Sequence, residues 1–96
     1  MTIENIEDLR AVRRAIGSNI AAMRQAHGWT VEHCARRAGL LPTKLAKYET
    51  GGCTINLEVL ARLALTLDVS LVWLLTVRTD PWRSIRGRQQ SLAEGR

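Results

Sequence analysis

Residues 30–51 of the chain, TVEHCARRAGLLPTKLAKYETG, predict two short helices that meet at a tight turn. A small residue, Ala35, falls where the first helix would cross the second. Gly39 permits the left-handed backbone conformation that commonly ends a helix. Leu45 would hold the second helix against an apolar core. This spacing therefore predicts a helix pair whose second member keeps its outer face exposed.

The segment before this pair predicts a longer helix, from about Ile6 to Ala26. Its apolar side chains recur every three or four residues and would form one stripe. The members of the stripe are Ile6, Leu9, Val12 or Arg13, Ile16, Ile20 and Met23. Gly17 inside the segment should weaken a helix by about 1 kcal/mol relative to alanine. Two helices joined near Gly17 are therefore the alternative.

Capping residues mark the starts of the two helices in the pair. Thr30 can cap the first through its hydroxyl, and Trp29 and Cys34 can form the flanking hydrophobic staple. Pro42 suits the first position of the second helix, although Leu41 before it is a poor cap. Both starts are expected, and the second should be less well fixed.

Two further starts follow the same logic. Asn56, with Ile55 and Leu60 as its staple, opens a helix that ends near Leu67. Ser70 opens a last short helix that continues to about Val77. The residues expected to face inward in the first of these helices are Leu57, Leu60, Ala61, Ala64 and Leu67. The sequence thus predicts an all-α bundle of five helices within residues 1–77.

The chain changes character after residue 77. Residues 78–96 carry five arginines against Asp80 and Glu94, and Asp80-Pro81 should break a helix. We expect an arginine-rich tail that is partly ordered or disordered. The net charge of +5 gathers on residues 31–50 and on this tail, which favours a polyanionic partner.

Several classes of protein are disfavoured. No apolar run is long enough to span a membrane, and the first residues do not resemble a signal peptide, so we expect a cytoplasmic protein with reduced cysteines. No catalytic motif is present, and we expect neither an enzyme nor a cofactor.

The residue types that bind metals lack the spacing of a metal site. They are His27, His33, Cys34 and Cys53. Cys34 should be a small buried hydrophobic residue. Cys53, in an expected loop, is either inert or an exposed redox-responsive thiol.

The ordered set of motif residues resembles the lambda repressor and Cro-like helix-turn-helix regulators, also called the Xre family. The resemblance covers roughly Ile16 to Leu75. Its carriers are Ile16-Gly17, Ile20, Arg24, Gly28-Trp29-Thr30, Ala35, Gly39, Leu45, Tyr48-Glu49-x-Gly51, Leu57, Leu60, Ala64, Leu67, Val69 and Leu74. It implies a compact bundle of five helices that binds double-stranded operator DNA as a homodimer.

The resemblance also implies roles for individual residues. Helices two and three would be Val31–Ala38 and Pro42–Thr50. The base-contacting residues would be Pro42, Thr43 and Lys47. The phosphate-contacting residues would be Thr30, Val31, Arg37, Lys44 and Thr50. Arg24 and Glu49 would form an ion pair that joins helix one to the end of helix three.

The chain departs from the family pattern at three places. Val31 stands where glutamine is usual, and Pro42 has no N–H to donate to a base. Residues 52–54, Gly-Cys-Thr, lack the basic side chains that often follow helix three. These losses motivate the alternative function, a protein-interaction module or an antitoxin whose tail binds a partner such as a toxin.

The last helix has more apolar residues than one face can bury. The expected homodimer interface comprises Leu71, Trp73, Leu74, Leu75 and Trp82. Such a dimer would place two recognition helices about one DNA turn, roughly 34 Å, apart. The alternative is a monomer in which Ile3, Ile6 and Leu9 cover this patch. The sequence therefore predicts a transcriptional regulator, expected to be a repressor, that binds a pseudo-palindromic operator.

Overall fold

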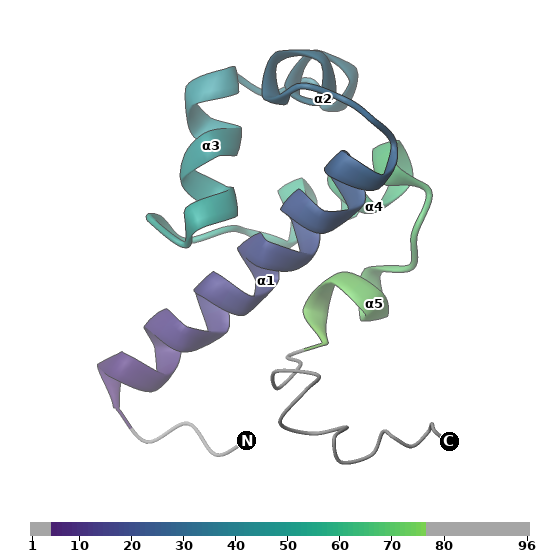
Figure 1. Ribbon diagram of the computed structural model, residues 1–96. Coiled ribbons are helices and arrows are strands. Elements are labelled where there is room, and N and C mark those ends of the chain that lie inside the picture. The colour runs from purple at the N-terminus through teal and green to yellow at the C-terminus, as the bar shows by residue number, and fades with distance from the viewer. Residues whose placement is uncertain (1–4, 77–96) are drawn as a thin grey trace.

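The computed structural model describes residues 5–76, which form five α-helices and no strand. The helices are α1 (Ile6–Ala26), α2 (Val31–Ala38), α3 (Pro42–Thr50), α4 (Leu57–Leu67) and α5 (Leu71–Leu75). Figure 1 shows α1 running diagonally across the molecule, with α2 and α3 together at one end and α5 beside the middle of α1. The predicted all-α five-helix architecture is confirmed. The expected tail, residues 78–96, lies outside the described residues.

The predicted caps are present at the helix starts. The Thr30 hydroxyl accepts a hydrogen bond from the His33 N–H at 3.0 Å, and the Ser70 hydroxyl accepts one from the Trp73 N–H at 3.0 Å. The Asn56 amide oxygen accepts from the Val59 N–H at 2.8 Å. Leu41 makes no capping bond through its side chain, as expected. Each cap satisfies one N–H that the first turn leaves unpaired.

The core lies where all five helices meet. Its fully buried large side chains are Ile20, Leu45, Leu63, Leu67, Leu74 and Cys34. The prediction that Leu57 faces inward at the start of α4 was wrong, because this side chain is 64% exposed. Leu63, which was not expected inside, is fully buried. The buried stripe on α4 is therefore rotated from the predicted one and begins at Leu60.

The apolar stripe of α1 is buried only in its middle. Ile16 and Ile20 belong to the core, whereas Ile6 is 58% and Leu9 is 43% exposed. Figure 1 shows why: the first turns of α1 extend past the other helices. Ile6 and Leu9 are consequently not part of the core that the described residues form.

Gly17 lies at the closest approach of two helices. A Cβ added there would stand 2.6 Å from the Glu49 carbonyl oxygen and would also overlap the carbonyl oxygen of Tyr48. Helix α1 is continuous through this residue, so the alternative of two helices joined near Gly17 was wrong. The absent side chain lets the backbones of α1 and α3 approach each other.

Asn19 is a buried polar residue that the sequence analysis did not single out. It is 8% exposed, and its side-chain N–H2 group donates to the carbonyl oxygens of Leu74 at 3.0 Å and Thr76 at 2.8 Å. A third, longer contact reaches the Trp73 carbonyl at 3.4 Å. Asn19 therefore donates to carbonyl groups at the end of α5, where the last carbonyls of a helix lack partners within the helix.

Candidate nucleic-acid interface

Helix α3 has one buried face and one exposed face. Leu45 and Tyr48 point into the core and are 0% and 4% exposed. The exposed side chains are Thr43, Lys44, Ala46, Lys47 and Thr50, and Pro42 is half-buried. The expected base-contacting residues Thr43 and Lys47 thus share one solvent-facing surface. We call these exposed α3 residues, with Pro42, the outer face of α3.

A nearly buried ion pair holds the far end of α3 in place. Arg24 Nε donates to Glu49 Oε2 at 2.7 Å, and Arg24 Nη2 donates to Glu49 Oε1 at 3.0 Å. The side chains are only 13% and 10% exposed. This is the bidentate geometry that satisfies both a guanidinium and a carboxylate away from water. The pair that the resemblance implied therefore ties α1 to α3 directly.

The same guanidinium reaches the loop before α2. Arg24 Nη1 donates to the Trp29 carbonyl oxygen at 2.8 Å. The hydrogen bond to Glu49 raises the pKa of Arg24, while partial burial opposes that increase. Arg24 is therefore a cation in the folded protein, as arginine is in general. One cation positions the end of α3 and the entry to α2 together.

Trp29 organises the exposed side of α2. Its ring stacks on His27 with the centroids 4.4 Å apart, and His33 lies tilted at 5.2 Å. The Arg37 guanidinium carbon lies 4.9 Å from the centre of the same ring. A cation held over an aromatic face has fewer orientations to lose on binding an anion. Sequence spacing does not reveal this arrangement, because Trp29 and Arg37 are eight residues apart.

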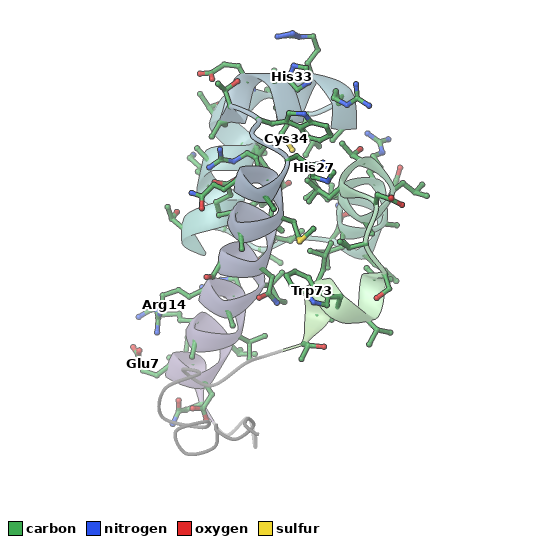
Figure 2. All side chains as sticks on the ribbon, turned by 45° about the vertical axis from the view of Figure 1, so that its right-hand side comes forward. Glu7, Arg14, His27, His33, Cys34 and Trp73 are labelled. Atoms are coloured by element: carbon green, nitrogen blue, oxygen red, sulfur yellow. The ribbon has the colours of Figure 1, made fainter. Side chains whose placement is uncertain are left out.

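His27 also joins α1 to α4. Its Nε2 atom lies 2.7 Å from the Leu67 carbonyl oxygen, so the tautomer with a proton on Nε2 donates a hydrogen bond there. Figure 2 shows His27, His33 and Cys34 gathered at the end of the molecule where α2 lies. The His27 contact is structural, since its ring nitrogen faces a carbonyl group.

The other expected phosphate-contacting residues lie at the edges of the pair. Thr30 is exposed but its hydroxyl caps α2, and Val31 is half-buried. Lys44 is exposed, with its Nζ 5.9 Å from the Tyr48 ring centre. The Thr50 hydroxyl donates to the Lys47 carbonyl oxygen at 3.1 Å. The hydroxyl groups of Thr30 and Thr50 are therefore already hydrogen-bonded within their own helices.

Leu41, expected from the sequence to be only a poor cap, is also a feature of this surface. It is 71% exposed at the entry to α3, directly before Pro42. A single exposed apolar side chain is common on protein surfaces, but at this position it would lie against any partner that binds the entry to α3. The signal in the sequence was its position, an apolar residue where a polar cap is preferred.

The cysteines and histidines do not assemble a metal site. Within residues 5–76, no group of three or more metal-ligating side chains comes together. Cys34 is fully buried, as expected, and burial raises the pKa of its thiol. Cys53 is half-buried in the loop after α3 and is not disulfide-bonded.

The expected dimer residues do not share one environment. Leu74 is fully buried within the bundle, so its assignment to an interface was wrong. Leu71 and Trp73 are half-buried, and Leu75 is 39% exposed. Figure 2 shows Trp73 between α5 and α1. Trp82 lies outside the described residues.

No helix in the described part of the chain is both long and apolar enough to cross a lipid bilayer.

The order of the helices, the exposed outer face and the ion pair can be compared with known proteins. A sequence profile described as a helix-turn-helix domain matches residues 17–78. The chain belongs to the helix-turn-helix domain family. This match contains α2 and α3, the whole ion pair and the second half of α1, from residue 17 onward. No curated protein sequence matches the chain.

Solved structures of three regulators resemble the chain at 26% sequence identity each. The hypothetical transcription factor NHTF from Neisseria has a TM-score of 0.69, with 80% of this chain and 83% of that chain covered. The clp gene regulator ClgR from C. glutamicum has a TM-score of 0.64, with coverage of 67% and 83%. The restriction-modification controller protein C.AhdI from Aeromonas hydrophila has a TM-score of 0.61, with coverage of 67% and 94%.

The helix-turn-helix family and these neighbours place the chain among DNA-binding regulators of transcription rather than among enzymes. They also agree with the family expected from the motif residues.

Proposed function

We propose that this regulator is a repressor that binds a pseudo-palindromic operator as a homodimer, with the outer face of α3 in the major groove. The observation that carries the proposal is the contrast between the two faces of α3. Leu45 and Tyr48 fix the helix to the core, and Glu49 fixes its end, while Thr43 and Lys47 stay exposed. A rigidly held helix with a polar outer face can read base edges.

Two exposed side chains on α3 suit contacts with base edges. Lys47 can donate to guanine O6 or N7, and Thr43 can contact a thymine methyl group or a phosphate. Lys44 and Arg37 supply charge for phosphates on either side of the groove. The arginine-rich residues 78–96 would add charge that does not depend on base sequence.

The proposed dimer uses exposed apolar residues of α5. Val72 is 74% exposed and Leu75 is 39% exposed. Ile6 and Leu9 are exposed too, so the alternative in which they cover this patch within one monomer receives no support. We therefore assign Leu71, Val72, Trp73 and Leu75 to the interface and remove Leu74 from it.

The test begins with a selection of duplexes from a random library by the whole chain. Binding to the selected duplex is then measured against salt concentration, with a scrambled duplex as reference. We expect a preferred, two-fold-related sequence and a steep negative slope of affinity against salt.

Two lysines on the same helix provide matched variants. Lys47→Ala should relax base preference at one position in each half-site and cost about 1–3 kcal/mol of binding free energy. Lys44→Ala should weaken all duplexes about equally and reduce the salt slope by about 1. If selection yields no preferred sequence, or if both variants behave alike, the operator-reading role of α3 is wrong.

Partner binding is the second candidate function, and the exposed Leu41 is the observation that favours it. Leu41 stands at the front of α3, where a polar side chain would suit DNA phosphates better. In this case a Leu41→Ser variant would lose a protein complex formed on co-expression with the product of a neighbouring gene, while DNA binding stayed at the nonspecific level. Loss of sequence-selective DNA binding instead would favour the operator role.

A further inference from the structure

We propose that Arg14 on α1 is an additional phosphate-binding residue, which replaces the cation that the loop after α3 lacks. The inference rests on the proposed DNA-binding role of α3 and extends it to an element outside the helix pair. The ligand is a backbone phosphate of the duplex, next to the end of α3.

The loop that follows α3 has no charge of its own. Residues 51–54 are Gly-Gly-Cys-Thr, so no side chain there can neutralise a phosphate. The loop nevertheless stays beside the last turn of α3, because the Gly52 N–H donates to the Lys47 carbonyl oxygen at 2.8 Å. A phosphate that flanks bases contacted by Lys47 would therefore meet an uncharged loop.

Helix α1 crosses directly over this loop. Gly51 has a φ of +76°, and a Cβ added to it would stand 2.8 Å from Arg14 Cγ and 2.9 Å from the Arg14 backbone nitrogen. The neighbouring Arg13 donates from Nε to the Gly51 carbonyl oxygen at 3.5 Å. The aliphatic stem of Arg14 thus lies on Gly51, which is the residue that ends α3.

The Arg14 side chain is exposed beyond that contact. Figure 2 shows it on the side of α1 that faces away from Trp73 and α5. Within residues 5–76, no carboxylate forms a salt bridge with Arg14, whereas Arg10, one turn earlier, is paired with Glu7 at 3.0 Å. Arg14 therefore offers its charge to an external anion.

Position and charge together identify the ligand. Phosphate neutralisation depends on where a cation lies and not on which element carries it. Arg14 lies next to the loop where a charge is missing, and Lys47 lies on the adjoining turn. The positive surface of the interface therefore continues from α3 across the loop to α1.

The test compares variants of the whole chain on the selected duplex over a range of salt concentrations. Arg14→Gln keeps much of the stem that packs on Gly51 but removes the charge. We expect affinity to fall about three- to tenfold near 0.1 M salt, with a salt slope smaller by about 0.9 and an unchanged base preference. Arg14→Lys should retain the wild-type slope. Arg62→Ala, which removes an exposed arginine of α4 paired with Glu58, is the control and should leave the slope unchanged.

A rescue variant adds a second readout. A Cβ at Gly52 would meet its nearest atoms at 3.4 and 3.5 Å, which is ordinary contact, so a lysine fits there. We expect Arg14→Gln/Gly52→Lys to regain the lost slope and affinity, since it returns a cation to the loop.

The outcomes separate this inference from the proposed function. If wild-type protein binds its selected duplex and Arg14→Gln keeps the wild-type slope, the role of Arg14 is wrong while the role of α3 stands. If the double variant binds no better than Arg14→Gln, the phosphate does not lie beside this loop, and the inference is likewise wrong. If the wild-type protein prefers no duplex, the wild-type titration alone rejects both proposals.

Discussion

The contact between α1 and α3 depends on the missing side chain of Gly17. Gly17→Ala would drive a methyl group into two backbone carbonyl groups of α3, which cannot rotate away as a side chain could. The overlap should cost about 3 kcal/mol, the upper end of the range for overpacking, and alanine's helix propensity returns about 1 kcal/mol, so we expect the free energy of unfolding to fall by about 2 kcal/mol. Urea unfolding measures the change. Ser18→Ala at the exposed neighbouring position is the control, and equal stability of the two variants would contradict the close contact.

The Arg24–Glu49 pair gives a second prediction for single residues. Glu49→Gln leaves a nearly buried guanidinium without its anion, so stability should fall by about 3–5 kcal/mol. Replacing both residues with apolar ones, as in Arg24→Met/Glu49→Leu, should recover much of that loss, because no buried charge remains unpaired. Thermal unfolding at matched concentrations measures both. A double variant as unstable as the single one would show that the pair acts in another way.

Among the helices, α5 is the one that depends most on a single polar side chain from elsewhere. Asn19→Asp is nearly isosteric, but a carboxylate cannot donate to the carbonyl oxygens of Leu74 and Thr76. We expect a loss of about 1–3 kcal/mol and faster amide hydrogen exchange confined to α5.

The same substitution at Asn56 is the matched control. There the side-chain oxygen accepts a bond from the Val59 N–H, and a carboxylate accepts equally well at a helix start. Asn56→Asp should therefore preserve stability. If Asn19→Asp were as harmless, the three contacts to α5 would carry no free energy.

The positions of the helices could be predicted from the sequence because local signals determine them. Thr30, Asn56 and Ser70 cap their helices by accepting a hydrogen bond from the backbone N–H three residues later in the sequence. Gly39 ends α2 with a φ of +73°. None of these signals depends on distant parts of the chain. The helix starts after Gly28 consequently lie within one or two residues of their predicted positions.

Features that depend on tertiary contacts could not be predicted in the same way. The periodicity of α1 marks Ile6 and Leu9 as apolar but does not reveal that, among the described residues, both side chains stay largely exposed. Likewise, the sequence marks Gly17 as a residue that weakens a helix. Only the fold shows that its missing side chain lets the backbone of α3 pack against α1. Of the interface, the outer face of α3 followed from the resemblance, while the position of Arg14 over Gly51 required the fold.

For the whole molecule, the proposed assembly can be tested at one exposed position. Val72→Glu places a charge in the proposed α5 interface without disturbing the core, since Val72 is 74% exposed. We expect its dimer dissociation constant to rise at least about tenfold, because a buried unpaired charge costs several kcal/mol. Sedimentation velocity over a range of concentrations measures this. Leu65→Glu on α4, where the leucine is 84% exposed, is the control and should leave the dimer intact.

The proposed dimer would also determine how the molecule reaches its operator. Two outer faces of α3 must reach successive major grooves on one side of the duplex, roughly 34 Å apart. Val72→Glu should then bind a single half-site as well as the wild type does but lose most of its advantage on the full site. An unchanged preference for the full site would indicate that the two-fold contact lies elsewhere.

The outer face of α3 is the part of the molecule on which the whole account depends, and amide chemical shifts can map it directly. Nitrogen-15-labelled protein is titrated with its selected duplex, and the shift of each backbone amide is followed. We expect the largest changes on residues 43–47 and the start of α2, with a smaller group near Arg14 and Gly51. Changes confined to α4 and α5, with α3 unaffected, would contradict it.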